Sequence, residues 1–469
     1  MLRKFILMIV VGTLFLSCER DSSKDVTKPD INHKVKMASP RELSAGVSTI
    51  FTATSYAYDQ NADWVTGKLY DRFLNGDALY DDPRDTSTNP KTGGRGPLFC
   101  GTSCGSCHNN SGRTKSSLIT DAGTGPGDFS SFLTFIRTPN DQYHRNYGRV
   151  LHDHAIYGVK PEGKVHVKYT EEPHTLPDGT KYSLRVPKYW ITDFYMEDID
   201  MSQVEMTVRT PLRHVGMGQI MALDLDEIKA LEKKQYPEYG ISGEINWVNE
   251  RGKRRVGLTG HKAHHSDLTV ELGFLSDMGI TSHRYPLEIS YGQPQCTEDH
   301  GIEISSEDMA DVDLYLHCLG VPSRRNINSE MVQYGAKMFR KAKCHLCHVE
   351  TLHTRPEGAT LIDGTNLPWL GGQTIHPYSD FLVHDMGPKL GDDFSQYNAS
   401  GDEWRTAPLW GGGLQKIVNT HTDYLHDGRA RNVFEAIMWH GGEGDVSRQI
   451  FANMNANDRQ ALIAFVNSL

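Results

Sequence analysis

Two Cys-x-x-Cys-His pentapeptides carry most of the chemical information in this chain: Cys104-Gly-Ser-Cys107-His108 and Cys344-His-Leu-Cys347-His348. In c-type haem proteins, both thiols of such a motif form thioether bonds to the porphyrin, and the adjacent His is the proximal iron ligand. With eight cysteines in 469 residues, two chance copies of the motif would be very rare. The motifs therefore predict two covalently bound haem c groups, attached through the four cysteines, with His108 and His348 as iron ligands.

Two other uses of the paired cysteines are weaker. Both pairs together could form a Cys₄ zinc site. Zinc does not need a His directly after each pair, however, and a separation of about 240 residues between the pairs would be unusual. A thioredoxin-like redox pair would stand next to a βαβ pattern, and neither motif does. The sequence therefore favours haem.

The first 18 residues predict export. Arg3 and Lys4 precede an apolar stretch from Phe5 to Leu16, which leads to Cys18. This pattern is typical of a lipoprotein signal peptide, so Cys18 is expected to carry the lipid anchor. About a dozen apolar residues are too few to cross ~30 Å of hydrocarbon. We expect an exported bacterial envelope protein, periplasmic or cell-surface, that meets the membrane only through this lipid.

The net charge limits the partners to be expected, and the remaining cysteines limit the possible disulfides. The formal net charge is −10, and the only basic run is Arg251 to Arg255, so nucleic acid is not an expected partner. After lipid and haem attachment, Cys100, Cys296 and Cys318 remain. In an oxidising compartment a Cys296–Cys318 disulfide is the expected pairing, with Cys100 free or close to the first haem loop.

The two haem motifs suggest how the chain is divided. Residues 19–40 are polar and predict a flexible tether. Residues 41–325 would form an N-terminal haem c domain and residues 326–469 a C-terminal one. The predicted fold is mainly α, with two class I cytochrome c-like domains and a loop-rich, partly β insertion in the middle of the chain.

Local patterns support this division. Ser329 can cap a helix whose apolar stripe runs into Cys344, and Asn455 precedes a second helix that ends at the C-terminus. These two helices are expected to cross near the second haem. Residues 164–170 and 181–186 alternate polar with apolar side chains and predict short hairpin strands.

The sixth iron ligand of each haem decides what that haem does, because a displaceable position admits a substrate and a strong ligand favours electron transfer. For the second haem, Asn432 starts a helix that places Val433, Ile437 and His440 on one apolar face. His440 is therefore the predicted sixth ligand. Met386 is the rival candidate.

Several segments resemble the bacterial di-haem oxidoreductases, which include proteins described as di-haem peroxidases and as thiol oxidoreductases. The family is distantly similar to the di-haem cytochrome c peroxidases and to the di-haem enzyme that matures tryptophan tryptophylquinone. The similar segments are Gly96–Phe99, Pro177–Arg185, Gly240–Asn246, Asp277–Ser282, His384–Gly387, Glu403–Gly411 and Leu425–Glu443.

The resemblance implies an iron ligand for the second haem and a direction for its reduction potential. In di-haem peroxidases a Met that follows a His-Asp-Gly turn is the distal ligand of the second haem, and the equivalent position here is His440. Imidazole in place of thioether implies a lower potential for this haem. The relatives carry Gly-Arg-Phe-Gly-Trp-Lys-Ala where this chain has Gly257-Leu-Thr-Gly-His261-Lys-Ala263, so His261 replaces the expected Trp.

The first haem has no single predicted sixth ligand. Its candidates are His144, His152, His154 and His261, and five more histidines lie in the same part of the chain: His166, His174, His214, His264 and His265.

The leading functional hypothesis is a peroxidase-like di-haem c oxidoreductase. Electrons from a donor protein or a quinol pathway would pass between the haems to reduce a small oxidant such as peroxide, with haem 1 as the reactive iron. The alternatives are a six-coordinate di-haem electron-transfer protein, and an oxidoreductase that acts on a protein side chain or thiol. Calcium is a further cofactor to test for. The catalytic acid or base is not identified by the sequence.

Overall fold

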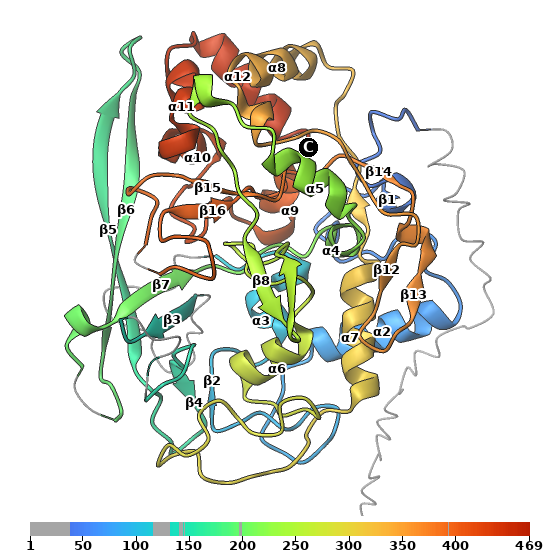
Figure 1. Ribbon diagram of the computed structural model, residues 1–469, viewed down its shortest axis with the longest axis vertical. Coiled ribbons are helices and arrows are strands. Elements are labelled where there is room, and N and C mark those ends of the chain that lie inside the picture. Colours follow the sequence, from blue (N-terminus) through green and yellow to red (C-terminus); the bar gives the residue numbers. More distant parts are fainter. Residues whose placement is uncertain (1–37, 116–131, 140–143, 145, 197–198, 393) are drawn as a thin grey trace, which may run out of the picture.

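The computed structural model describes residues 38–115, 132–139, 144, 146–196, 199–392 and 394–469 (Figure 1). The predicted signal peptide, Cys18 and nearly all of the tether lie outside these residues. The described chain is 29% helix and 20% strand, and its strands form eight two-stranded sheets. The predicted mainly α fold of two class I cytochrome c-like domains is therefore wrong. The strands pair over both short and long sequence separations, as β5 (Lys164–Thr175) does with β6 (Lys181–Thr192) and β1 (Thr49–Ile50) with β10 (Val321–Pro322), and the haem motifs carry no signal for these pairings.

The helices and strands are short and alternate along the chain. The helices are α2 (Lys68–Asp81), α3 (Cys104–Cys107), α4 (Met217–Met221), α5 (Leu225–Glu232), α6 (Val270–Met278), α7 (Ser306–Cys318), α8 (Glu330–Lys341), α9 (Gln415–Asn419), α10 (Val433–Trp439), α11 (Asp445–Ala452) and α12 (Ala456–Val466). The strands are β1 (Thr49–Ile50), β2 (Leu98–Phe99), β3 (Leu133–Arg137), β4 (His154–Ala155), β5 (Lys164–Thr175), β6 (Lys181–Thr192), β7 (Glu205–Arg209), β8 (Trp247–Glu250), β9 (Lys253–Val256), β10 (Val321–Pro322), β11 (Leu352–His353), β12 (Ala359–Thr360), β13 (Asn366–Leu367), β14 (Thr374–Ile375), β15 (Val383–Asp385) and β16 (Glu403–Arg405).

The two helices predicted for the C-terminal part are present as α8 and α12, which lie side by side at the top of Figure 1. Ser329 occupies the N-cap position of α8 without a side-chain cap bond, whereas the Asn455 side chain accepts a hydrogen bond from Asp458 N at 2.9 Å. A Cβ atom at Gly335 would lie 1.9 Å from the Ala461 carbonyl oxygen. The close contact between the helices therefore requires glycine at this position.

The strands predicted in the middle of the chain form one long hairpin, β5 with β6, on the left of Figure 1. Lys164 pairs with Thr192 and Thr175 with Lys181, so each strand is longer than predicted. Gly179 has φ +89° in the connecting Pro-Asp-Gly turn, a conformation that glycine adopts without strain. The prediction of β structure here is confirmed.

Two large buried clusters hold the molecule together. The first contains side chains from α2, α4 and α7 and from the segments around β11 to β14, so it includes residues on both sides of position 325. The second lies around α8, α10 and α12 and includes Leu176 and Leu184 of the hairpin. The hairpin thus packs against the C-terminal helices, which form one wall of the site described below.

The expected disulfide is absent from the described residues, where all seven cysteines are free. Cys318 is buried at the end of α7 in the first cluster, whereas the Cys296 thiol donates to Glu288 Oε2 at 3.4 Å. The Cys296–Cys318 prediction is therefore wrong, because the fold gives each thiol a different environment.

Gly335→Ala should lower the free energy of unfolding by about 1–3 kcal/mol, because the added methyl overpacks the contact between α8 and α12. Urea denaturation would measure the change. Lys337→Ala, at an exposed position of the same helix, is the control and should stay within about 0.5 kcal/mol. Equal effects of the two substitutions would contradict the proposed close contact.

Candidate functional site

The first haem motif lines a cavity of about 280 Å³, called here the first-motif cavity. Ser103 Oγ accepts a hydrogen bond from Ser106 N at 3.0 Å and so starts the short helix that carries Cys104 and Cys107. His108 follows directly, and its Nδ1 donates to the Leu212 carbonyl oxygen at 2.7 Å. This bond fixes the ring and leaves Nε2 as the nitrogen for a metal.

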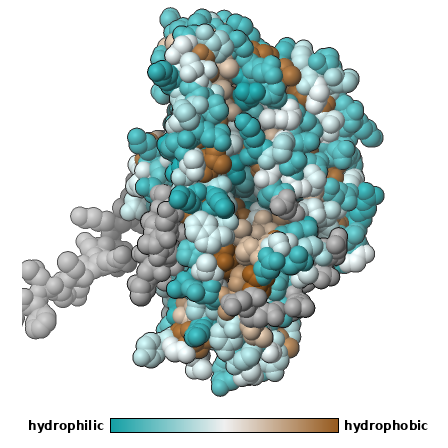
Figure 2. Space-filling view, turned by 90° about the vertical axis from the view of Figure 1, so that its left-hand side faces the viewer, coloured by the Kyte–Doolittle hydropathy of each residue, from teal (hydrophilic) through white to brown (hydrophobic). Residues whose placement is uncertain are grey.

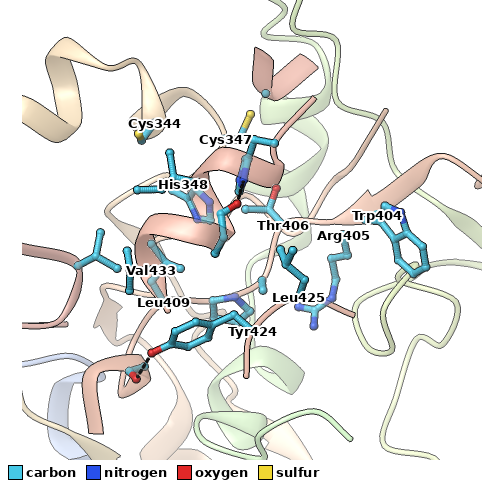
Figure 3. A pocket seen from close by; sticks show the side chains of 18 of the residues that line it. Cys344, Cys347, His348, Trp404, Arg405, Thr406, Leu409, Tyr424, Leu425 and Val433 are labelled. Atoms are coloured by element: carbon cyan, nitrogen blue, oxygen red, sulfur yellow. Dashed lines mark hydrogen bonds between the residues drawn. The ribbon is translucent and has the colours of Figure 1, made fainter. Parts of the chain in front are cut away.

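The second haem motif lines a cavity of about 290 Å³, the second-motif cavity (Figure 3). Cys344, Cys347 and His348 lie at the top of the view, and Tyr424 lies at the bottom. His348 Nδ1 donates to the Tyr378 carbonyl oxygen at 2.9 Å. Burial lowers the pKa of both motif histidines to about 4, so their imidazoles are neutral at pH 7, as metal ligands must be.

His440 also lines the second-motif cavity. Helix α10 ends at Trp439, so His440 follows its last turn, and its Nδ1 donates to the Ala436 carbonyl oxygen at 2.7 Å. A Cβ atom at Gly444 would lie 3.0 Å from both His440 Cδ2 and Met386 Cε, so the predicted ligand and its rival are neighbours. Of these two residues, only His440 resembles the motif histidines, whose Nδ1 atoms also donate to backbone carbonyl oxygens.

Each cavity is lined by arginine side chains that leave one buried N–H donor without a hydrogen-bond partner among the described residues. Arg405 Nη1 and Arg113 Nε line the second-motif cavity, are buried, and have no hydrogen-bond partner among the described residues. The same holds for Arg209 Nη2 in the first-motif cavity, where Asp392 lies 4.0 Å away. A buried N–H donor without a partner is costly, so the free donors of these three arginines fit the carboxylates of a haem.

The two cavities share one wall. Leu212, Met217 and His261 line both of them. His261 Nε2 donates to the Thr210 carbonyl oxygen at 2.8 Å. The ring meets Trp404 edge-on at 6.4 Å between centroids. His261 therefore occupies the boundary between the two predicted haem sites.

The other three candidates for the sixth ligand of the first haem do not line its cavity. Both ring nitrogens of His152 are occupied, by Glu162 Oε2 at 3.0 Å and by the Ser276 carbonyl oxygen at 3.0 Å. His154 Nδ1 bonds Asp153 at 2.8 Å. His144 Nδ1 accepts from Asn146 N at 3.2 Å. Of the four candidates, the structure places only His261 at the cavity.

Three further residues line the first-motif cavity: His214 and His264, which the sequence left among its open histidines, and Asp277, which it did not name as a site residue. His214 stacks on His108 with centroids 4.0 Å apart, and His264 is 5% exposed with no partner for Nδ1 among the described residues. Burial raises the pKa of Asp277 to about 6, although the Ser276 hydroxyl, which donates to Oδ1 at 2.6 Å, opposes this rise. Only Asp277 had a usable signal, since it opens the family-like segment Asp277–Ser282.

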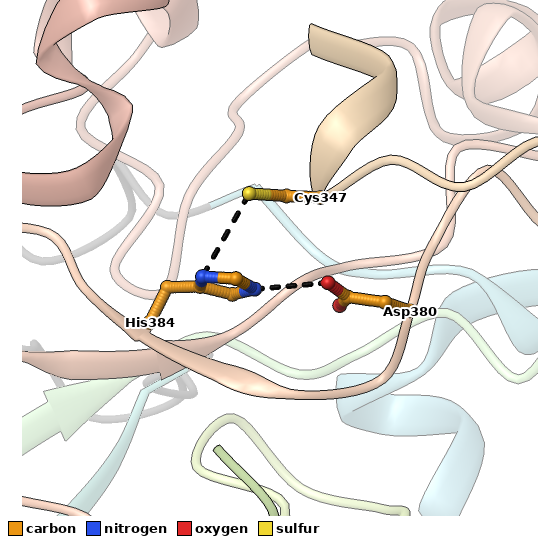
Figure 4. Close-up of side chains that lie close together, drawn as sticks. All are labelled: Cys347, Asp380 and His384. Carbon is orange, nitrogen blue, oxygen red and sulfur yellow. Dashed lines mark hydrogen bonds and ion pairs between the residues drawn. The ribbon is translucent and has the colours of Figure 1, made fainter. Parts of the chain in front are cut away.

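A zinc site is not supported. The two cysteine pairs line different cavities, so they cannot form one Cys₄ site. Cys347, Asp380 and His384 do gather (Figure 4), but His384 Nε2 bonds Asp380 at 2.9 Å and Nδ1 bonds Glu443 at 2.6 Å. Burial would lower the pKa of His384, yet the Asp380 carboxylate raises it well above its ordinary value. A protonated imidazole between two carboxylates has no lone pair for a metal.

The fold thus gives two cavities that share one wall, each lined by one Cys-x-x-Cys-His motif. A comparison with protein families agrees: the model described as "Di-haem oxidoreductase, putative peroxidase" matches residues 120–469. The chain therefore belongs to the di-haem oxidoreductase family. The match contains the second haem motif and begins after the first. Neither a curated protein nor a solved structure gives a significant match.

His440→Met should raise the reduction potential of one haem, by a fraction of the roughly 0.8 V that axial ligands control, because thioether stabilises ferrous iron better than imidazole does. Optical redox titration would measure both potentials. His353→Met, at a 54% exposed side chain, is the control and should leave them unchanged. Two unchanged potentials in His440→Met would show that His440 is not a ligand.

Proposed function

We propose that the protein is a peroxidase-like di-haem c oxidoreductase that reduces peroxide at the first-motif cavity. The observation that carries the proposal is an asymmetry between the cavities. His348 and His440 both line the second-motif cavity with Nδ1 held by a backbone carbonyl. Among the described histidines of the first-motif cavity, only His108 is held in this way. One iron would be six-coordinate, and the other would be open to an oxidant.

The haems, when bound, would supply electron storage and the iron at which peroxide is reduced. Four cysteines, Cys104, Cys107, Cys344 and Cys347, would attach them covalently. Each motif histidine is held by its carbonyl partner in one orientation, so its Nε2 is directed at the metal without reorganisation. The shared wall of Leu212, Met217 and His261 keeps the cavities adjacent and separates them with side chains, which suits electron transfer over a short distance.

Asp277 is the proposed proton donor. Its carboxyl lines the first-motif cavity, and burial raises its pKa to about 6. Peroxide reduction consumes two protons and releases two waters. A carboxylic acid that is protonated in mildly acidic solution can deliver these protons next to the reacting oxygen atoms.

The remaining expectations concern location and partners. We propose export as a lipoprotein through Cys18 to the periplasmic or outer surface of a bacterial envelope, with an electron-donor protein or a quinol pathway as the source of electrons. In the described part of the chain, no helix has the length and apolar character needed to cross a membrane. The formal charge of −10 does not favour nucleic acid.

Calcium remains a proposal from the sequence.

An electron-transfer protein is the second candidate function, and one observation favours it. His264 Nδ1 has no hydrogen-bond partner among the described residues, and the ring lines the first-motif cavity. Burial lowers the pKa of His264 well below its ordinary value, so the ring is neutral and could bind iron as a sixth ligand. This reading requires two six-coordinate haems. A protein side chain or thiol as substrate instead of peroxide is the third hypothesis.

Anaerobic titration of the fully reduced, haem-loaded protein with hydrogen peroxide tests the proposed function. One peroxide accepts two electrons, so one equivalent should oxidise both haems, and their optical bands should change in that proportion. A reduced protein that stays reduced on the timescale of mixing would contradict the proposal and favour an electron carrier.

Asp277→Asn should slow peroxide reduction about 100-fold or more, because an amide cannot donate the proton. In the unmodified protein the rate should fall as the pH rises through about 6, where the Asp277 carboxyl loses its proton, and the variant should lack this dependence. Stopped-flow kinetics between pH 4.5 and 8 would record both. Asp226→Asn, at an 87% exposed side chain, is the control. An unchanged pH profile in Asp277→Asn would exclude the assigned role.

A further inference from the structure

A row of aromatic side chains leads away from the predicted iron ligand His108 on the side of α2 and α7. His214 stacks on His108 at 4.0 Å, and the Tyr80 ring lies 5.8 Å from that of His214. Tyr315 follows at 5.0 Å from Tyr80, and Phe73 lies 5.0 Å from Tyr315. Four successive ring contacts of 4.0–5.8 Å thus connect the ligand to the core between the two helices.

The two tyrosines of this row are fully buried, and each has a proton-accepting partner. Tyr80 and Tyr315 are both 0% exposed. The Tyr80 hydroxyl lies 2.8 Å from His214 Nδ1. The Tyr315 hydroxyl donates to the Asp59 carboxylate and lies 2.8 Å from Ser111 Oγ. Imidazole and carboxylate are both bases that can take a phenolic proton.

Not every buried tyrosine combines such a partner with a place in this row. The Tyr378 hydroxyl donates to Glu350 Oε1 at 3.0 Å, but its ring contacts Phe339 and Phe465, outside the row. Tyr58 is also 0% exposed, but its hydroxyl donates to the Gly411 backbone carbonyl at 2.6 Å. A carbonyl oxygen orients a hydroxyl but does not accept its proton as a base at neutral pH. Tyr80 and Tyr315 therefore combine a basic partner with a place in the row that starts at His108, beyond what packing a buried phenol requires.

We propose that Tyr80 and Tyr315 form a redox-active pair that supplies electrons to the haem of the first-motif cavity when peroxide has oxidised it. This inference rests on the proposed function, which makes peroxide the oxidant. It adds a second source of electrons, independent of the second-motif haem and of the wall around His261.

The electrons and protons balance as follows. Tyr80 gives one electron to the oxidised haem centre, which is reduced by one electron, and the phenolic O–H bond breaks as its proton moves to His214 Nδ1. Tyr80 becomes a neutral tyrosyl radical. Tyr315 then gives an electron to Tyr80, which recovers its proton from His214, while the Tyr315 proton passes to Asp59. The radical ends on Tyr315.

Peroxide added to the oxidised, haem-loaded full chain tests the pair, with samples frozen after mixing. Electron paramagnetic resonance should show an organic radical with tyrosyl splittings. Tyr315→Phe should confine the radical to Tyr80, and Tyr80→Phe should reduce its yield at least fivefold. Tyr58→Phe is the matched control and should keep the full yield. The haem spectra before peroxide should be the same in all variants, which separates electron supply from a structural effect on His108.

The optical spectrum recorded in the same mixing experiment separates the two proposals. Haem oxidation by peroxide without a tyrosyl radical, or with a radical that survives Tyr80→Phe, would overturn the inference and leave the proposed function intact. Unchanged haem bands would contradict the proposed function. Flash-generated tris(bipyridine)ruthenium(III) would then replace peroxide as oxidant: a tyrosyl radical lost in Tyr80→Phe and kept in Tyr58→Phe supports the pair, and any other result overturns it.

Discussion

Three partly buried imidazoles hold their Nδ1 hydrogens against backbone carbonyl oxygens, and the predicted haem chemistry depends on these bonds. His108, His348 and His440 make them at 2.7, 2.9 and 2.7 Å. Each bond fixes the tautomer and the ring angle before any metal is present, so the free Nε2 is placed by the fold. The acceptors are Leu212 between β7 and α4, Tyr378 between β14 and β15, and Ala436 within α10.

The position of Leu212 links this constraint to the rest of the site. The same residue orients His108 through its carbonyl and forms part of the wall between the cavities through its side chain. Its neighbour Thr210 accepts a hydrogen bond from His261 through its carbonyl oxygen. Its neighbour His214 stacks on His108. One short segment thus orients His108 and forms part of the wall between the two cavities. The geometry of one predicted iron site therefore depends on that of the other.

The sequence predicted the parts of this arrangement that rest on local patterns. The pentapeptides, the helices beside Ser329 and Asn455, and the strands around residues 164–186 have signals that their own residues carry. The fold class and the disulfide could not be predicted, because they depend on which distant segments pair, as β1 does with β10. The residues that surround the first motif could not be predicted for the same reason. His214, His264 and Asp277 are assembled from separate segments, and no spacing distinguishes the two histidines from the others in this part of the chain.

The central claim is that the two irons differ, one held by two histidines and the other open to an oxidant. An electron paramagnetic resonance spectrum of the oxidised, haem-loaded protein, taken before and after one equivalent of peroxide, tests this claim most directly. We predict one low-spin signal of bis-histidine character that peroxide leaves unchanged, and one high-spin signal that peroxide removes. Two low-spin signals that both ignore peroxide would contradict it.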